Sequence, residues 1–167
     1  ENRLDGAHPY APYLASHQKT EFGTIRADDG QVLHYYMVRP ADDGKGTRHP
    51  VWSQHYGGPG VQRVTNQWKG ALPQYIADQG YIFFELDNRG MSGRGKAFED
   101  PIYHAMGTVE VADQLAGVDF VKTLPDVDPD KIVTYGWSYG GFLTLRLLED
   151  APGVFAAGVS GAPVTDW

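Results

Sequence analysis

Residues 136–140 read Gly-Trp-Ser-Tyr-Gly, so that Ser138 has a glycine two positions before it and two positions after it. This spacing is typical of a serine nucleophile on a sharp turn between a strand and a helix. The backbone of such a turn is strained and crowded, which explains the need for Gly136 and Gly140. The adjacent Gly141 is expected to let the following helix pack closely against a sheet. The pattern predicts acyl-transfer chemistry at the Ser138 hydroxyl.

The segments that flank Ser138 have the composition that such a turn requires. Residues 131–135 are rich in β-branched and aromatic side chains and predict a short buried strand. Residues 142–148 have the composition of a helix, whose amino end would direct backbone N–H groups and a positive dipole toward an oxyanion. Glycine-rich turns also occur without any catalytic role, but this context favours the nucleophile.

The rest of the chain must supply the scaffold that positions this turn. An approach segment occupies residues 1–19, and the expected elements are strands at 21–27, 31–39, 50–55, 81–86 and 154–160, and helices at 73–79 and 109–124. A hairpin followed by alternating strands and helices indicates an α/β domain with a mostly parallel sheet. Ligands bind at the carboxyl ends of such strands, where Tyr56, Ser138 and residues 162–164 fall.

Some side-chain positions can also be predicted for these elements. Helix 109–124 is expected to have Thr108 as its cap and Glu110 to complement its dipole. Its core residues repeat at helical spacing: Val111, Leu115, Val118 and Val121. In helix 73–79, one side is expected to carry Leu72, Tyr75 and Ile76 together. The strand at 154–160 is expected to be buried.

Composition excludes several classes of protein. The chain has 167 residues, enough for one domain, and its net charge of −7 argues against a nucleic-acid surface. It has no cysteine, which excludes disulfides, thiolate metal sites and a cysteine nucleophile. No apolar stretch approaches the roughly 18 residues of a membrane span. Because residues 1–4 are not a signal peptide and the first residue is not Met, we expect the sequence to start inside a longer protein. Residues 41–47 are expected to form a surface loop.

Residues 56–167 resemble the catalytic domain of the prolyl oligopeptidase family of serine peptidases, and most of all its dipeptidyl peptidase IV branch. Five motifs in the same order carry the resemblance: residues 56–59, 87–90, 107–114, 136–141 and 162–167. Trp137 and Tyr139 make the fourth motif more specific than a bare Gly-x-Ser-x-Gly. The resemblance implies an incomplete α/β-hydrolase fold, with an opening hairpin and a mostly parallel sheet up to about the sixth strand.

The resemblance also implies roles for individual residues. Ser138 matches the nucleophile, and the backbone N–H of Tyr139 and the hydroxyl of Tyr56 match the two oxyanion donors. Preorganised donors of this kind stabilise the negative oxygen of a tetrahedral intermediate. Tyr139, Val164 and Trp167 match the wall of a pocket that accepts proline, whose flat apolar ring suits aromatic neighbours. No cofactor or metal is implied.

Other polar residues are better explained as structural. Arg89 is expected to brace its own loop, and His49 and His55 to be structural rather than metal ligands. The glycine-rich residues 90–95 do not match a phosphate-binding loop. A run of three acidic residues lacks the glycine and terminal glutamate of a calcium loop: Asp126, Asp128 and Asp130.

The catalytic triad is incomplete in this sequence. In this fold the order along the chain is Ser, then Asp or Glu, then His, but all six histidines precede Ser138. Asp166 follows the serine too early to match the family's triad aspartate. We therefore expect the amino-terminal part of a catalytic domain, at residues 20–167, without the carboxyl-terminal part and without the family's β-propeller. Alone, such a piece should expose a sheet edge and be unstable or aggregate.

The leading functional hypothesis is a serine exopeptidase that releases amino-terminal dipeptides after Pro or Ala. A carboxylesterase or an acylaminoacyl-peptidase on the same fold is one alternative, and a catalytically silent fragment or interaction module is another. The partners expected from the resemblance are peptide substrates, the remainder of the catalytic domain, a β-propeller and a second copy in a homodimer. A periplasmic or other extracytoplasmic location is also suggested by resemblance alone.

Overall fold

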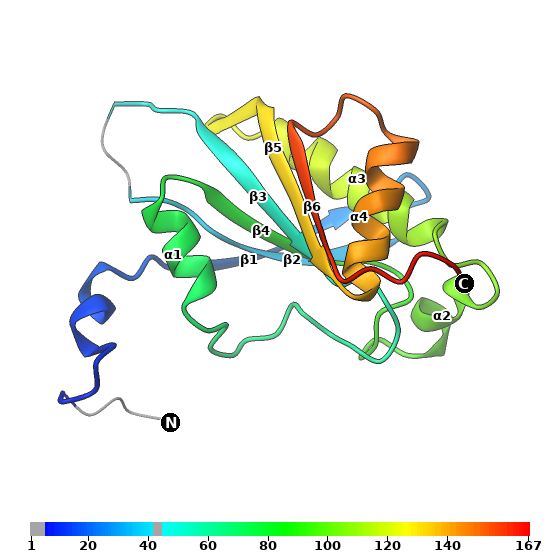
Figure 1. The fold of residues 1–167 in the computed structure, drawn as a ribbon, viewed down its shortest axis with the longest axis horizontal. Coiled ribbons are helices and arrows are strands. Elements are labelled where there is room, and N and C mark those ends of the chain that lie inside the picture. Colours follow the sequence, from blue (N-terminus) through cyan, green and yellow to red (C-terminus); the bar gives the residue numbers. More distant parts are fainter. Residues whose placement is uncertain (1–5, 42–44) are drawn as a thin grey trace.

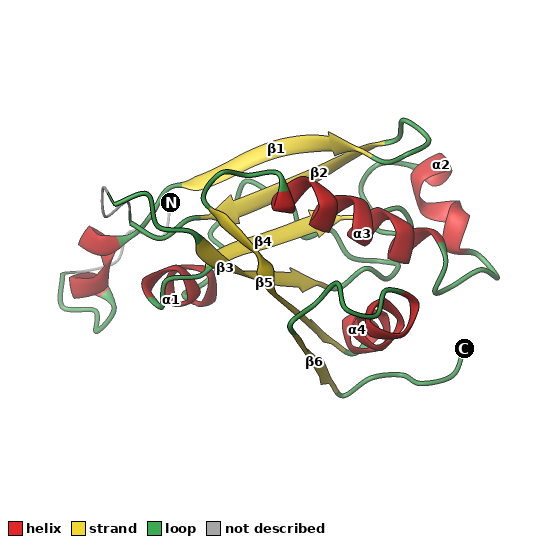
Figure 2. Cartoon of the chain, turned by 90° about the horizontal axis from the view of Figure 1, so that it is seen from above, coloured by secondary structure: helices red, strands yellow, loops and turns green. Residues whose placement is uncertain are grey.

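The computed structural model describes residues 6–41 and 45–167, which form a six-stranded sheet in the order β1-β2-β4-β3-β5-β6 (Figure 1). The strands are β1 Thr20–Arg26, β2 Val32–Val38, β3 His49–His55, β4 Ile82–Asp87, β5 Val127–Trp137 and β6 Ala157–Gly161. β1 and β2 form an antiparallel hairpin, and β2 pairs antiparallel with β4. β3 pairs parallel with β4 and β5, and β5 with β6. Figure 2 shows the sheet twisting from β1 at one edge to β6 at the other.

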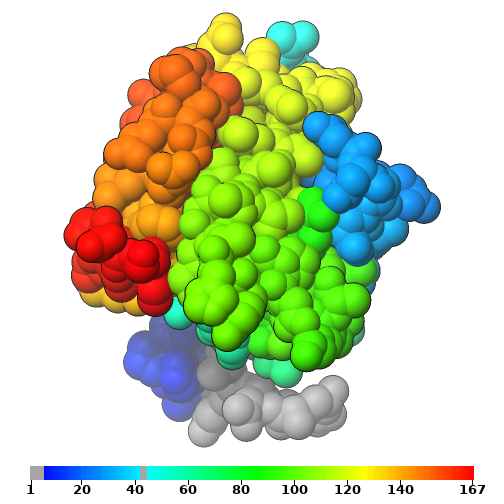
Figure 3. Space-filling view, turned by 90° about the vertical axis from the view of Figure 1, so that its right-hand side faces the viewer, coloured from blue at the N-terminus to red at the C-terminus, as the bar shows by residue number. Residues whose placement is uncertain are grey.

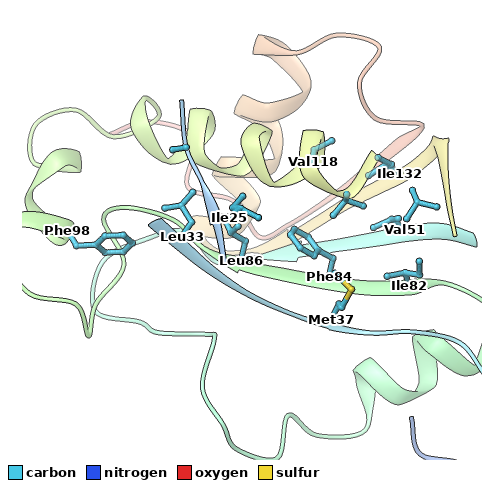
Figure 4. Close-up of a cluster of buried hydrophobic side chains, with 13 residues drawn as sticks. Ile25, Leu33, Met37, Val51, Ile82, Phe84, Leu86, Phe98, Val118 and Ile132 are labelled. Carbon is cyan, nitrogen blue, oxygen red and sulfur yellow. The ribbon is translucent and has the colours of Figure 1, made fainter. Parts of the chain in front are cut away.

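The helices are α1 Leu72–Asp78, α2 Lys96–Glu99, α3 Val109–Lys122 and α4 Tyr139–Asp150, with 3₁₀ turns at Ala11–Ser16 and Asp100–Ile102. Residues alternate along the strands, so that the two faces of the sheet have separate cores. Phe84 lies in the core under α3, whereas Phe83 packs with Ile76 of α1 on the opposite face. Figure 4 shows the core under α3. A third cluster joins α3 to α4 through Val111, Leu143 and Leu147.

The predicted hairpin, parallel strands and two main helices are confirmed, with shifted ends. α4 begins at Tyr139, three residues earlier than expected, and β5 begins at Val127. The register of β5 against β3 shifts between His49 and Val51, so residues 128–130 lie in an irregular part of the strand rather than in a separate turn. The loop predicted at 41–47 lies partly outside the described residues, and residues 1–4 lie wholly outside them.

Three detailed predictions were wrong. In α1, Ile76 is buried but Leu72 and Tyr75 are exposed, because Pro73, Ile76 and Ala77 supply the face that packs on the sheet. Thr108 does not cap α3 with its side chain. Its hydroxyl donates instead to the carbonyl of Ala105.

The third wrong prediction is the burial of the last strand. β6 is one of the two edge strands of the sheet and pairs only with β5. Its residues are exposed or partly exposed, and Val159 is among the exposed large apolar side chains. An apolar composition predicted burial, but burial depends on a neighbour that the described residues do not supply.

In the part of the chain that the structure describes, no helix combines the length and the apolar composition needed to cross a membrane.

Candidate active site

Ser138 stands at the point where β5 ends and α4 begins, with backbone angles φ 59° and ψ −114°. A positive φ is uncommon for a residue other than glycine and points to a constrained, functional turn. The neighbouring glycines are required by close approach. A Cβ atom on Gly136 would collide with the carbonyl of Gly140, and one on Gly140 would collide with the carbonyl of His55. The predicted strand–serine–helix turn is therefore present.

Backbone hydrogen bonds hold this turn in place. The Ser138 N–H donates to the carbonyl of Gly161 at the end of β6 (2.9 Å), and the Phe142 N–H donates to the carbonyl of Ser138 (3.1 Å). A Cβ atom on Gly141 would lie 2.5 Å from the Gly161 carbonyl oxygen. The absence of a side chain at Gly141 thus lets α4 pack closely on the sheet, as predicted.

His55 lies directly beneath the turn. Its Nε2 is 3.1 Å from the carbonyl oxygen of Gly140 and 3.0 Å from the Thr144 hydroxyl oxygen. Because a carbonyl only accepts, Nε2 carries the proton. Burial lowers the pKa of His55 to about 4, so the ring is neutral near pH 7. The geometry agrees with the structural role predicted for His55 and leaves it no role as the base of Ser138.

Tyr56 follows β3 at the same edge of the sheet as Ser138. His55 pairs with Gly136 in the register of β3 and β5, so the residues that follow these strands emerge side by side. The rings of Tyr56 and Tyr139 are 6.1 Å apart. Tyr139 is the first residue of α4, where a backbone N–H has no acceptor within the helix. The sheet therefore places Tyr56, Ser138 and Tyr139 at the same edge.

The residues predicted to wall a pocket meet in part. The ring of Trp167 lies 5.3 Å from that of Tyr139, and both contact Phe142, which the sequence analysis did not single out. Tyr139 is 2% exposed, whereas Trp167 is 60% and Val164 36% exposed. One side of the cluster is therefore open to solvent.

A groove of about 550 Å³ runs beside this aromatic cluster. Figure 3 shows the C-terminal residues lying against α4, with the segment before α3 next to them. The groove is lined by Met106, Gly107, Thr108, Phe142, Leu145, Arg146, Glu149, Thr165, Asp166 and Trp167.

Comparison with known proteins decides the family. The model of the prolyl oligopeptidase family matches residues 67–167, more than half of the chain. The chain belongs to the prolyl oligopeptidase family.

Relatives and solved structures agree with this assignment. Dipeptidyl peptidase 8 of Homo sapiens is 35% identical over 98% of this chain, and a probable dipeptidyl peptidase 4 of Neosartorya fischeri is 38% identical over 83%. The structure of Porphyromonas gingivalis dipeptidyl peptidase 4 is similar with a TM-score of 0.85 at 34% identity, over 90% of this chain and 22% of that one. A candidate dipeptidyl aminopeptidase IV of Bacteroides ovatus gives 0.87 at 42% identity, over 96% and 23%.

These matches confirm the resemblance to dipeptidyl peptidases and the α/β-hydrolase fold. The chain spans only 18–19% of the length of these two curated relatives.

Helix α3 connects the family's motifs through a buried polar face that the sequence analysis missed. Glu110, Asp113 and Gln114 are almost fully buried and lie at positions i, i+3 and i+4, on one side of the helix. The expected pattern was a helix with an apolar inner face and a polar outer face. The sequence did contain a signal for this polar face, because Glu110, Asp113 and Gln114 recur at helical spacing within the motif at residues 107–114.

Gln114 supports the turn that carries Tyr56. Its Nε2 donates to Asn88 Oδ1 (2.8 Å), and Asn88 Nδ2 donates to the carbonyl of Gly57 (2.9 Å). Two buried amides thus link α3 to the residue after Tyr56. Such networks fix geometry when every member has a partner.

Asp113 supports the adjacent loop. Its carboxylate accepts hydrogen bonds from the Arg89 backbone N–H (2.8 Å) and from Arg89 Nη2 (2.6 Å), and it has no exposed surface. Arg89 also pairs with exposed Asp29 (2.5 Å). The Asp113 carboxylate, more than any other group, raises the pKa of the Arg89 guanidinium above its usual range. Arg89 braces its loop as the sequence predicted.

A second buried acidic pair fixes the loop that follows Tyr56. The Asp87 carboxylate accepts the backbone N–H groups of Arg63 (2.9 Å) and Val64 (3.0 Å). Glu85 accepts from Arg63 Nε (2.7 Å) and from the Tyr36 hydroxyl (2.5 Å). Burial raises the pKa of Asp87, although these amide hydrogen bonds act in the opposite direction. No local pattern in the sequence indicates the partners of these acids.

No group of three or more potential metal ligands occurs within residues 6–41 and 45–167.

Proposed function

We propose that this chain supplies the nucleophile and the oxyanion hole of a serine exopeptidase that releases amino-terminal dipeptides after Pro or Ala. In this proposal the chain is the amino-terminal part of a catalytic domain in a longer protein. The positive φ of Ser138 at the start of α4 carries the proposal, because a helix needs no such strained turn for packing alone. The names of the relatives support it.

The reaction follows from the atoms at the turn. Ser138 Oγ attacks the carbonyl carbon of the scissile peptide bond, and a base takes the hydroxyl proton. The negative oxygen of the intermediate accepts hydrogen bonds from the Tyr139 N–H and the Tyr56 hydroxyl. The C–N bond then breaks, the leaving amine receives the proton, and water hydrolyses the acyl-enzyme.

Specificity for proline is supported by the aromatic cluster beside the nucleophile. Tyr139, Phe142 and Trp167 present rings in mutual contact. A rigid apolar ring of the substrate would bury its surface against the open side of this cluster with little loss of conformational freedom. Val164, in the same C-terminal segment as Trp167, would complete the wall.

The base must come from outside the described residues. His55 is engaged beneath the turn, and every histidine precedes Ser138 in the sequence. We propose that the rest of a catalytic domain supplies the triad Asp and His, and that a β-propeller holds the free amino group of the substrate. A homodimer is part of the same proposal. The small share of the relatives' length that this chain spans supports the additional segments of the longer protein.

Because every histidine precedes Ser138, a second candidate function applies to the chain alone, which would then be catalytically inactive. Loss of the histidine of a serine peptidase costs on the order of 10⁶ in turnover.

The test compares two substrates of the complete protein that carries these residues. Gly-Pro anilide should be hydrolysed much faster than a short acyl ester, and Ser138→Ala should abolish both activities. Hydrolysis of the ester alone would replace the peptidase by an esterase. Anilide hydrolysis that survives in Ser138→Ala would remove Ser138 from the mechanism. A lack of turnover by the isolated chain would agree with the chain alone being catalytically inactive.

A further inference from the structure

Glu110 has contacts that its position in the sequence does not explain. As the second residue of α3 it would ordinarily face solvent and complement the helix dipole. Instead its side chain is fully buried. Its carboxylate accepts hydrogen bonds from the backbone N–H of Gly107 (2.5 Å), the backbone N–H of Thr108 (3.0 Å) and the hydroxyl of Tyr139 (2.7 Å).

The three contacts fall into two groups. The two backbone amides belong to the start of α3 and would be satisfied by any capping carboxylate. The Tyr139 hydroxyl is 29 residues away in the sequence and belongs to the first residue of α4. Since all three groups are donors and a carboxylate accepts, each of the contacts is favourable. The contact with Tyr139 is the one that local capping does not require.

The Tyr139 ring is the part of the site that this contact can control. It is almost fully buried, and a Cβ atom on Gly58 would lie only 2.5–2.8 Å from its atoms, so the ring packs against the backbone of the Tyr56 turn. On another side it faces Trp167 at 5.3 Å. A buried tyrosine hydroxyl needs a hydrogen-bond partner. The Glu110 carboxylate is that partner, and the hydrogen bond to it fixes the orientation of the confined ring. Burial, together with Glu110, raises the pKa of that hydroxyl, which therefore remains a donor.

We propose that Glu110 is a positioning residue that fixes the Tyr139 ring as a wall of the substrate pocket and thereby sets the preference for proline over smaller residues. The proposal rests on the proposed function, since it assigns a pocket beside Ser138. Glu110 touches no reacting atom. It acts through the hydroxyl of Tyr139, while the backbone N–H of that residue remains at the start of α4.

A double-mutant cycle in the complete protein tests this link. The variants are Glu110→Gln, Tyr139→Phe and the double variant, and kcat and KM are measured with Gly-Pro and Gly-Ala anilides. Glu110→Gln retains the shape of the side chain and removes its charge, while Tyr139→Phe removes only the hydroxyl. A lost hydrogen bond to a charged group corresponds to a roughly tenfold effect or more. Each single variant should therefore raise KM for Gly-Pro anilide about tenfold, with kcat changed less than threefold and a smaller effect on Gly-Ala.

The decisive result is the absence of additivity. If Glu110 acts through the Tyr139 hydroxyl, the double variant should show the KM and the Pro-to-Ala selectivity of Tyr139→Phe alone. A role limited to capping α3 predicts additive effects and equal losses with both substrates, which would overturn the proposal. The matched control is Glu21→Gln on β1, at the far edge of the sheet, where Glu21 pairs with Arg39. It should leave both substrates unaffected.

Failure of the proposal can be separated from failure of the proposed function. A wild-type protein that does not cleave Gly-Pro anilide refutes the peptidase. An active wild-type protein whose Tyr139→Phe variant keeps its KM and selectivity refutes only the role of Glu110. If Glu110→Gln does not fold, the KM and the Pro-to-Ala selectivity of Tyr139→Phe still test the proposal.

Discussion

Arg89 pairs with one buried carboxylate and one exposed carboxylate, so the effect of burial on the strength of an ion pair can be tested on a single arginine. Asp113 has no exposed surface and accepts from both the guanidinium and the backbone N–H of Arg89, whereas Asp29 is 56% exposed and contacts Arg89 through the guanidinium alone. Removing one partner of a buried ion pair costs about 3–5 kcal/mol, because the other charge is left without compensation. An exposed pair contributes far less. Asp113→Asn and Asp29→Asn should therefore behave very differently.

The size of the effect can be read from hydrogen exchange. The Arg89 amide donates directly to Asp113, so its exchange reports on opening of the loop. Asn retains one acceptor oxygen, and Asp29 still pairs with the Arg89 guanidinium. The expected cost is therefore at the lower end of that range, about 3 kcal/mol, or roughly a hundredfold faster exchange at 1.4 kcal/mol per factor of ten. Hydrogen–deuterium exchange by mass spectrometry, on peptides that cover residues 88–95, measures this in the complete protein.

Asp29→Asn is the matched control and should leave that exchange rate unchanged. Equal and small effects of the two substitutions would refute the argument that burial makes Asp113 the dominant partner. A large effect of Asp29→Asn alone would reverse the assignment.

Three further predictions follow from the site. Tyr56→Phe should lower kcat for Gly-Pro anilide by about 10²–10³ with little change in KM, since it removes one of the two proposed oxyanion donors; an unchanged kcat in steady-state assays would exclude that role. Gly140→Ala should abolish labelling by a fluorophosphonate, because the added Cβ atom would collide with the His55 carbonyl, whereas Gly95→Ala, which meets no atom within 4 Å but has a φ of 85°, should leave labelling intact. The pKa of His55 in the folded protein is about 4, below the ordinary 6.5, so the unfolded state binds more protons between these two pH values. The free energy of unfolding should therefore fall as the pH drops from 6.5 to 4, by roughly 3 kcal/mol in total. Denaturation curves of His55→Gln that keep this pH dependence would contradict the assignment.

The local features of the turn at Ser138 were predictable from sequence because they depend on near neighbours. Gly136 and Gly140 are required within the turn itself, and the strand and helix on its two sides have clear composition. The antiparallel hairpin and the parallel strands followed from the same local patterns. The position of Tyr56 beside Ser138 also followed, because parallel strands end at one edge of the sheet.

The errors concern features that tertiary packing decides. Tyr75 is exposed because neighbours in α1 face the sheet, and β6 is exposed because the described residues provide no strand on its outer side. Thr108 had the right composition for a cap, but its hydroxyl donates to the carbonyl of Ala105 and caps no N–H of the helix. The hydrogen bond from Tyr139 to Glu110 joins residues 29 positions apart, so no local pattern could have revealed it.

The central claim is that Ser138 is an activated nucleophile in the complete protein, and covalent labelling tests it most directly. The protein is treated with a fluorophosphonate and analysed by intact-mass spectrometry and peptide mapping. We expect one adduct, on Ser138, that is absent from Ser138→Ala and from the isolated 18.4 kDa chain. A complete, folded protein that gains no adduct, or gains it on another residue, would contradict the account.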